Sequence, residues 1–378
     1  MKLKITVVVG TRPELIRLSR VMHILDQFCN LRLLHTGQNY DYELNGIFFD
    51  ELKIRKPDKY LDASGHNAAQ TIANVISTVD QDLRDNRPEA FLVLGDTNSC
   101  LAAISAKRQK IPCFHMEAGN RCYDQRVPEE LNRKIVDHVC DINLTYSHVA
   151  REFLIAEGFS PQMVINIGSP MFEVLNHYKV NIEASTALDD LDVRSGQYFL
   201  CSFHREENVE DAGCFENFRI ILNKLANKYK YPILVSTHPR TRKKLEISIA
   251  HGVKYDDRIK FLKPLGFFDY NKLQCEAACV LSDSGTISEE ASILNFNALN
   301  LRESHERLEA MEEAAVMMVG LNLDRIIQAI DYLITDKSNN ERRINLPASY
   351  SVDNVSIKVL KIIMSHIDYV NKVVWKKN

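Results

Sequence analysis

Short runs of apolar residues alternate along the chain with longer segments in which apolar residues recur every three or four positions. Short apolar runs are typical of buried strands, and the wider spacing is typical of amphipathic helices. In the first half, Glu14–Asp26 and Ala68–Leu83 show the helical spacing. The strands predicted there are Ile5–Val9, Leu31–His35, Phe91–Leu94, Pro112–His115, Ile142–Thr145 and Val164–Ile167.

The same alternation returns in the second half of the chain, after a polar stretch that ends at Gly196. The strands predicted there are Tyr198–Ser202, Ile233–Thr237, Ile259–Leu262, Val280–Ser282 and Ala298–Leu301. A repeated order of strand then helix predicts parallel sheets covered by helices on both faces. We therefore expect an α/β protein with two Rossmann-like, doubly wound domains and a cleft between them. Ligand sites in such sheets lie at the carboxyl ends of the strands.

The places where this alternation breaks predict the domain boundaries. The first domain is expected at residues 1–174, a linker at 175–196 and the second domain at 197–352. Residues 353–378 are expected to form a C-terminal helix, because the apolar residues from Val355 to Val370 fall on one helical face.

The composition excludes several classes of partner. The 378 residues carry 47 Lys and Arg against 50 Asp and Glu, a formal charge of −3. This balance argues against nucleic acid, whose partners carry a strong basic excess. No apolar run approaches the roughly 20 residues that a membrane span needs, and residues 1–20 lack the pattern of a signal peptide. The nine cysteines are scattered, so we expect free thiols and a cytoplasmic location.

Acids that follow predicted strands are candidates for acid–base chemistry. Asp96 and Glu117 each follow a strand directly, and Glu129 opens a helix after Pro128. Asp96 alone fits a helix N-cap as well as a site carboxylate, and acids in a first helical turn are often only dipole partners. Parallel strands nevertheless deliver such residues to one edge, where crowded carboxylates raise one another's pKa. Because no His or Cys cluster accompanies them, a metal site is the weaker interpretation.

Basic residues follow other predicted strands. Arg12 and Arg17 lie at the start of the first helix, where they fit an anion contact or a solvated helix start equally well. His204 and Arg205 follow the first strand of the second half, and His238 follows the next strand. A lone histidine is usually structural, whereas one beside an arginine at a strand end suits a phosphate contact or proton transfer.

The most informative stretch is the turn after the predicted strand Val280–Ser282. Ser284, Gly285 and Thr286 combine two hydroxyl donors with a glycine whose backbone can approach an anion closely, at the start of a helix. This combination predicts a seat for a diphosphate, and Glu290 one turn later can accept ribose hydroxyls. An ordinary capped helix is the alternative.

Taken in order, these motifs resemble the non-hydrolysing UDP-N-acetylglucosamine 2-epimerase family. They span residues 10 to about 310, most of the chain. The matching pieces are Gly10-Thr11-Arg12-Pro13-Glu14, Gly95-Asp96-Thr97, Glu117-Ala118-Gly119, Pro128-Glu129-Glu130 with Asn132-Arg133, His204-Arg205, and Asp283-Ser284-Gly285 with Glu289-Glu290. The resemblance implies a glycosyltransferase-B-like architecture, a homodimer, a UDP-sugar in the cleft and a C-terminal helix that crosses back onto the first domain.

The resemblance also implies roles for individual residues. The implied catalytic residues are Asp96, Glu117 and Glu129 as acid–base groups, and His204 at the substrate or its diphosphate. The residues implied to bind the substrate or its UDP are Arg12, Arg17, Gln38, Arg133, Arg205, His238, Pro264, Tyr270, Ser284, Gly285, Thr286, Glu290 and Arg307. Within that set, the stretch Pro264–Tyr270 lies where the family cradles uracil.

Some variations are similar to one branch of the family. They are Gly37–Asp41, Glu117–Asp124, and Ser284–Thr286 in place of a double glycine. That branch converts UDP-2-acetamido-2,6-dideoxy-L-talose to UDP-N-acetyl-L-fucosamine. The chain departs from the branch at Leu308 and Ala310, where proline and glycine are usual, so we expect a different backbone in this loop.

The implied chemistry sets requirements that these residues meet. Breaking the C1–O bond to UDP acidifies the C2 proton, elimination gives a 2-acetamidoglycal, and re-addition with the proton on the opposite face inverts C2. This reaction requires two proton-transfer groups and a cationic seat for the diphosphate. It requires no metal or nicotinamide cofactor. A glycosyltransferase of the same architecture, a hydrolysing epimerase that releases free sugar, and a UDP-sugar sensor without turnover remain as alternatives.

Overall fold

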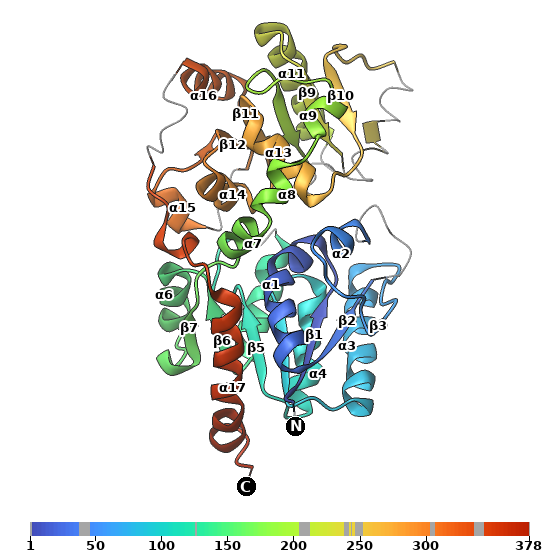
Figure 1. The fold of residues 1–378 in the computed structure, drawn as a ribbon, viewed down its shortest axis with the longest axis vertical. Coiled ribbons are helices and arrows are strands. Elements are labelled where there is room, and N and C mark those ends of the chain that lie inside the picture. Colours follow the sequence, from blue (N-terminus) through green and yellow to red (C-terminus); the bar gives the residue numbers. More distant parts are fainter. Residues whose placement is uncertain are drawn as a thin grey trace. The chain divides into compact units, whose positions relative to one another are not determined.

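The computed structural model describes residues 2–37, 46–124, 127–203, 212–237, 242, 244–245, 252–302, 307–335 and 344–377. The chain divides into two compact units. Unit 1 consists of residues 1–177 and 348–378, and unit 2 consists of residues 178–347. Each unit contains a parallel β-sheet flanked by helices, as Figure 1 shows, so the expected α/β class with two doubly wound sheets is confirmed.

The core of unit 1 is its sheet. The strands are β1 (Lys4–Val9), β2 (Asn30–His35), β3 (Lys59–Tyr60), β4 (Ala90–Leu94), β5 (Cys113–Met116), β6 (Ile142–Thr145) and β7 (Val164–Asn166). They form a seven-stranded sheet in the order β3-β2-β1-β4-β5-β6-β7, and every neighbouring pair is parallel. Residues 5–9 of β1 are all buried, as expected for a central parallel strand covered on both faces.

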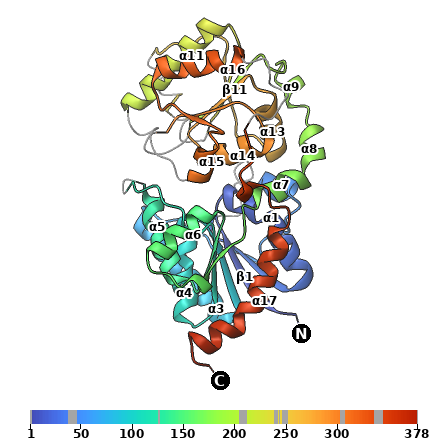
Figure 2. The same cartoon turned by 90° about the vertical axis from the view of Figure 1, so that its left-hand side faces the viewer.

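Helices cover both faces of this sheet. The helices of unit 1 are α1 (Arg12–Phe28), α2 (Ile47–Glu51), α3 (Ala68–Asp85), α4 (Ala103–Arg108), α5 (Pro128–Val139), α6 (His148–Ala156), α7 (Met171–His177) and α17 (Val355–Val373), with 3₁₀ turns η2 (Asn98–Ala102), η3 (Pro161–Met163) and η4 (Ala348–Tyr350). Helices α3 and α4 pack on one face, where their apolar residues share a core with Val8, Phe91 and Val93. Figure 2 shows α1 and α17 together on the other face.

Helix α17 is last in sequence but belongs to unit 1, where it packs against α1. Its residues Val359 and Ile363 are fully buried. Its first turn is fastened by Glu173 of α7, which accepts hydrogen bonds from the backbone N–H and the hydroxyl of Ser356. The C-terminal helix therefore crosses back onto the first sheet, as the resemblance implied.

Unit 2 repeats the layered plan with a smaller sheet. Its strands are β8 (Phe199–Ser202), β9 (Ile233–Ser236), β10 (Ile259–Leu262), β11 (Cys279–Ser282), β12 (Ala298–Asn300) and β13 (Met317–Met318). They form a parallel six-stranded sheet in the order β10-β9-β8-β11-β12-β13. Its helices are α8 (Lys179–Glu183), α9 (Ala187–Asp190), α11 (Ala212–Tyr229), α13 (Phe267–Glu276), α14 (Ile287–Leu294), α15 (Leu308–Glu312) and α16 (Leu323–Thr335).

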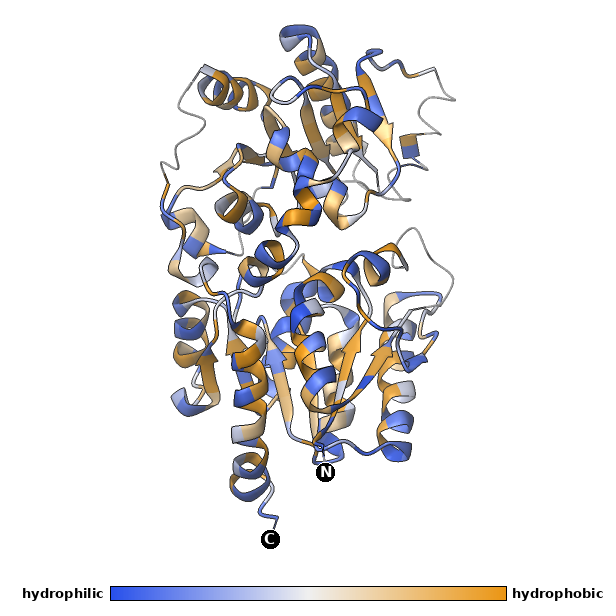
Figure 3. Ribbon diagram, viewed as in Figure 1, coloured by the Kyte–Doolittle hydropathy of each residue, from blue (hydrophilic) through white to orange (hydrophobic). Residues whose placement is uncertain are grey.

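The two faces of this second sheet have separate cores. Helices α11 and α16 share one core with Phe199 and Leu281, and helices α13 and α14 share the other with Leu200 and Val280. Consecutive strand residues thus point to opposite faces. Figure 3 shows largely hydrophobic strands between helices that carry both hydrophobic and hydrophilic residues.

The stretch expected as a linker, residues 175–196, contains short helices. It holds the end of α7 and the whole of α8 and α9. Ala187, Leu188 and Leu191 pack into the core of unit 2 that also contains Tyr198. The stretch looked like a linker in the sequence because its short helices expose many polar residues and bury only a few apolar ones.

All nine cysteines are thiols outside any disulfide. Burial raises the pKa of thiols such as Cys201 and Cys279, so these side chains behave as small apolar core residues. In the described part of the chain, no helix combines the length and the apolar content needed to cross a bilayer.

Candidate active site

The topology of each sheet indicates where a ligand binds. In unit 1 the strand order reverses at β1, which pairs with β2 on one side and β4 on the other. In unit 2 the same reversal occurs at β8, between β9 and β11. Ligands of open α/β sheets bind at the carboxyl ends of the strands beside such a reversal. The residues that follow β4, β5 and β11 are therefore the candidates.

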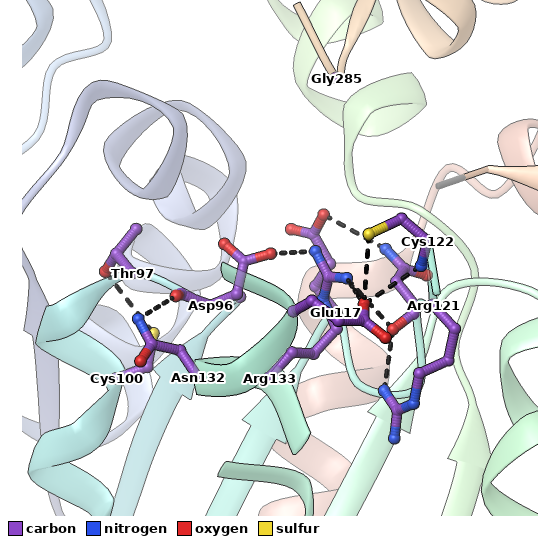
Figure 4. Close-up of polar contacts among 12 residues, drawn as sticks. Asp96, Thr97, Cys100, Glu117, Arg121, Cys122, Asn132, Arg133 and Gly285 are labelled. Carbon is purple, nitrogen blue, oxygen red and sulfur yellow. Dashed lines mark hydrogen bonds and ion pairs between the residues drawn. The ribbon is translucent and has the colours of Figure 1, made fainter. Parts of the chain in front are cut away.

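Asp96 follows β4 and Gly95. The 3₁₀ turn after it has Thr97 as its N-cap, whose hydroxyl accepts a hydrogen bond from the Ser99 N–H at 3.2 Å, so Asp96 does not cap it. The Asp96 carboxylate instead forms an ion pair with Arg133 of α5 (Figure 4). With 19% of its side chain exposed, Asp96 is held by an arginine yet stays accessible to a ligand.

Glu117 follows β5 directly and has a left-handed backbone, with φ at +65°. Its carboxylate pairs with the guanidinium of Arg17 from α1, and both side chains are less than a tenth exposed. The guanidinium carbon also lies 5.9 Å from the centre of the Tyr146 ring. A strained backbone that the surroundings hold in place is typical of functional positions.

Helix α5 supplies two further carboxylates near these residues. Pro128 is its first residue, and Glu129 and Glu130 lie in its first turn. Glu129 is half-buried, whereas Glu130 is 2% exposed and accepts hydrogen bonds from Arg133 at 3.2 Å and from the Cys122 N–H at 3.1 Å. Glu130 thus fixes the side chain of Arg133, which pairs with Asp96.

These pairings change the electrostatics suggested by the sequence. The sequence pattern suggested acids that crowd one another, and the structure adds an arginine to each of Asp96 and Glu117. A carboxylate paired with arginine has a fixed geometry and a balanced charge. The arrangement therefore offers two oriented carboxylates at the ends of neighbouring strands, suited to proton transfer.

Residues 284–286, which follow β11, have the features of an anion site and are called the anion turn. The Ser282 hydroxyl accepts a hydrogen bond from the Ser284 N–H at 3.0 Å and lies 2.6 Å from the Ser202 hydroxyl. The Ser284 and Thr286 hydroxyls are 3.0 Å apart, and Thr286 is the N-cap of α14. The Thr286 N–H donates to the Ser284 hydroxyl at 3.3 Å, so the N–H groups of Ser284 and Thr286 both shape the turn. Residues 284–286 are half-exposed, so an anion at this helix N-terminus can reach the two hydroxyls.

The comparisons with known proteins decide the family. The family model described as UDP-N-acetylglucosamine 2-epimerase matches residues 25–364. The chain belongs to this epimerase family. A structure titled UDP-N-acetylglucosamine 2-epimerase from Rickettsia bellii is 48% identical, with a TM-score of 0.93 and full coverage of both chains.

Relatives of the same name occur in archaea. The UDP-N-acetylglucosamine 2-epimerase of Methanocaldococcus jannaschii is 31% identical over 349 residues, covering 89% of this chain and 94% of the relative. A crystal structure of that enzyme in complex with UDP-GlcNAc and UDP has a TM-score of 0.88 at 28% identity, covering 96% of this chain and 100% of the other. The chain is thus similar along most of its length to members of a family of isomerases.

Three further residues that the epimerase resemblance assigned to UDP binding are Arg307, Glu290 and Tyr270. Arg307 is 3% exposed and donates from Nε to the Gly285 carbonyl at 3.2 Å, so it fastens the anion turn. Glu290 is half-buried, and one carboxylate oxygen accepts a hydrogen bond from Gln274 at 2.7 Å. Tyr270 lies within α13 and packs against one core of unit 2.

Pro264 lies between β10 and α13 and is half-buried. Arg12, the first residue of α1, is half-buried, with its guanidinium carbon 5.9 Å from the centre of the Phe48 ring. The remaining assigned residues, Gln38, His204, Arg205 and His238, lie outside the described residues. Among the residues that the structure does describe, no group of three or more His, Cys, Asp or Glu side chains has the arrangement of a metal site.

Glu14 is part of the site region but was not singled out from the sequence. It is 1% exposed, and one oxygen accepts hydrogen bonds from the N–H groups of Gly10 and Thr11, both at 2.7 Å. Its other oxygen accepts the Thr97 hydroxyl at 2.7 Å, which links the turn after β1 to the turn after β4. Burial raises the pKa of Glu14 above its ordinary value of 4.5, although these hydrogen bonds oppose the shift.

This shift predicts a pH dependence of stability. Because the pKa of Glu14 is higher in the folded than in the unfolded chain, the folded state binds more protons between the two values. The free energy of unfolding should therefore fall as the pH rises from about 4.5 through the folded pKa. Urea denaturation of the wild type and Glu14→Gln across this range measures it. A wild type that does not weaken relative to the variant as the pH rises would contradict the prediction.

Proposed function

We propose that this protein is a UDP-N-acetylhexosamine 2-epimerase that inverts C2 of its sugar by elimination and re-addition of UDP. The observation that carries the proposal is the placement of Asp96 and Glu117 at the carboxyl ends of the neighbouring strands β4 and β5, in a member of the epimerase family. Two oriented carboxylates suit a reaction that removes a proton from one face of a carbon and returns one to the other.

The reaction balances without a redox partner. The C1–O bond breaks, and its electron pair leaves with the diphosphate oxygen of UDP. A carboxylate takes the C2 proton, and the electrons of the C2–H bond form the C1=C2 bond of a 2-acetamidoglycal. UDP then attacks C1 as the second acid protonates C2 from the opposite face. Positive charge at the diphosphate seat stabilises the leaving group.

The proposed roles follow the chemistry of each unit. In unit 1, Asp96 and Glu117 transfer the protons with help from Glu129, and Arg133 and Arg17 orient the first two acids. In unit 2, the diphosphate is bound by the Ser284 and Thr286 hydroxyls and the backbone N–H of Gly285. Glu290 accepts the ribose hydroxyls.

Two substrates fit this proposal. One is UDP-N-acetylglucosamine, interconverted with UDP-N-acetylmannosamine, which agrees with the names of the relatives. The other, favoured by the variations at Gly37–Asp41 and Glu117–Asp124, is UDP-2-acetamido-2,6-dideoxy-L-talose, giving UDP-N-acetyl-L-fucosamine for a surface polysaccharide. We further propose a homodimer.

NMR of the products from a panel of UDP-N-acetylhexosamines tests the function. We expect C2-inverted nucleotide sugar from one or more members of the panel. Transfer of sugar to an added acceptor without inversion would replace the proposal with a glycosyltransferase, and accumulation of free hexosamine would replace it with a hydrolysing epimerase. Tight binding without turnover would indicate a sensor.

The anion turn gives a separate prediction for UDP affinity. Removing both hydroxyls in Ser284→Ala/Thr286→Val should weaken UDP binding by about 10- to 100-fold, because hydrogen bonds to a charged group are strong. Isothermal titration calorimetry with UDP measures the change. Ser292→Ala, on the same helix, is the matched control, since the Ser292 hydroxyl donates to the Ser288 carbonyl within α14. Equal affinities in the two variants would remove the turn from the UDP site.

A further inference from the structure

A buried ionic network connects to the turns that carry Asp96 and Glu117, and the proton transfers proposed above make no use of it. Its members are His115 of β5, Arg121 in the following loop and Asp137 of α5, and each of these side chains is 0% exposed. Nδ1 of His115 lies 2.9 Å from one carboxylate oxygen of Asp137, and Arg121 lies 2.8 Å from the other.

Each ring nitrogen of His115 lies beside an acceptor. Its Nε2 lies 2.7 Å from the carbonyl oxygen of Gly95. Its Nδ1 faces the carboxylate of Asp137, without the alignment of a hydrogen bond. A carbonyl oxygen and a carboxylate oxygen only accept, so His115 bridges two acceptors, one next to Asp96 and one on α5.

Arg121 is shared between two carboxylates. Besides Asp137 it binds Glu157 through two contacts, at 2.8 and 2.7 Å. Burial by itself raises the pKa of Asp137, but the close approach of His115 and Arg121 outweighs it and leaves that pKa lowered. Buried charges are tolerated when they are paired in this way.

The network holds both catalytic turns at once. Through His115 it binds the carbonyl of Gly95, the residue before Asp96. Through Asp137 it accepts the backbone N–H of Gly119, two residues after Glu117, with distances of 3.2 and 3.4 Å to the two oxygens. The two turns follow the neighbouring strands β4 and β5. Asp137 binds one turn directly and contacts His115, which binds the other, so a change at Asp137 alters both attachments.

We propose that His115, placed between the Gly95 carbonyl and Asp137, is a positioning residue that sets the separation of Asp96 and Glu117. With this separation fixed, a proton removed from one face of C2 is followed by delivery to the other face before the glycal escapes. The inference rests on the proposed function. His115 acts through the backbone of Gly95 and does not touch the substrate.

The variants His115→Asn and Asp137→Asn test this role. Asparagine at 115 can still donate a hydrogen bond but lacks the second ring nitrogen that faces Asp137. We expect kcat per folded molecule to fall about 10- to 100-fold, the usual cost of misplacing catalytic groups by about 1 Å, while KM and UDP affinity change less than about threefold. Release of free 2-acetamidoglycal with UDP should rise relative to inverted product. The stoichiometry of UDP binding counts the folded molecules.

Asp141→Asn is the matched control. Asp141 is 6% exposed and pairs with Lys107. It also accepts a hydrogen bond at 2.9 Å from the N–H of Cys113, the first residue of β5. This variant should lose stability without a change in kcat per folded molecule or in glycal release. If His115→Asn and Asp137→Asn behave as Asp141→Asn does, the positioning role is wrong. If the wild type inverts none of the nucleotide sugars, the proposed function fails first, and this inference with it.

Discussion

Asp96→Asn and Glu117→Gln are each expected to lower kcat by about 100- to 10,000-fold, the range that a general acid or base contributes. Both substitutions keep the size of the side chain and an oxygen that can accept from the paired arginine, Arg133 or Arg17. The geometry should therefore survive while the proton-transfer group is lost. UDP affinity should stay within about twofold, because neither acid is assigned to the nucleotide. NMR of products and UDP calorimetry on the same samples measure both quantities.

Asp85→Asn is the control for this pair. It makes the same chemical change at an exposed carboxylate at the end of α3 and should leave kcat unchanged. Wild-type turnover in Asp96→Asn or in Glu117→Gln would remove that residue from the mechanism. A loss of UDP binding equal to the loss of turnover would show that the acid serves the fold or the ligand, not proton transfer.

Gly119→Ala is expected to destabilise unit 1 by about 2 to 5 kcal/mol. Gly119 has φ at +80°, and a Cβ atom there would lie 2.4 Å from the carbonyl oxygen of Ala150. The substitution adds the cost of a left-handed backbone to a clash with main chain, which cannot rotate away. Because the same glycine follows Glu117 by two residues, activity should fall with stability.

Gly158→Ala separates the two costs. Gly158 has φ at +95°, but no atom lies within 4 Å of an added Cβ, so only the backbone cost of about 1 to 2 kcal/mol is expected. Urea unfolding followed by Trp375, the single tryptophan and a residue of unit 1, measures both variants. Equal losses in the two would show that the contact with Ala150 relaxes easily.

The sequence predicted those elements whose hydrophobic pattern is long enough to recognise. The strands expected at Ile142–Thr145 and Ile259–Leu262 have the same bounds as β6 and β10, and the other expected strands differ by one residue at one or both ends. The strands β3 and β13 were missed because each has two residues at the edge of its sheet, too few to show a period of two.

The sequence predicted site residues only where their position directly after a strand was enough to select them. Because parallel strands share one carboxyl edge, positions after β4 and β5 were enough to select Asp96 and Glu117. The partner of Glu117 is Arg17, 100 residues away, and no local pattern encodes such a pairing. Asp137 was missed because, within α5, a buried acid looks the same in sequence as a solvated one.

Exchange of the C2 hydrogen with solvent is the sharpest test of elimination and re-addition. The enzyme is incubated in D₂O with the nucleotide sugar that it turns over, and the product is examined by NMR. We expect every inverted UDP-sugar to carry deuterium at C2, with UDP still attached at C1. An inverted product that keeps its original hydrogen at C2 would contradict this mechanism.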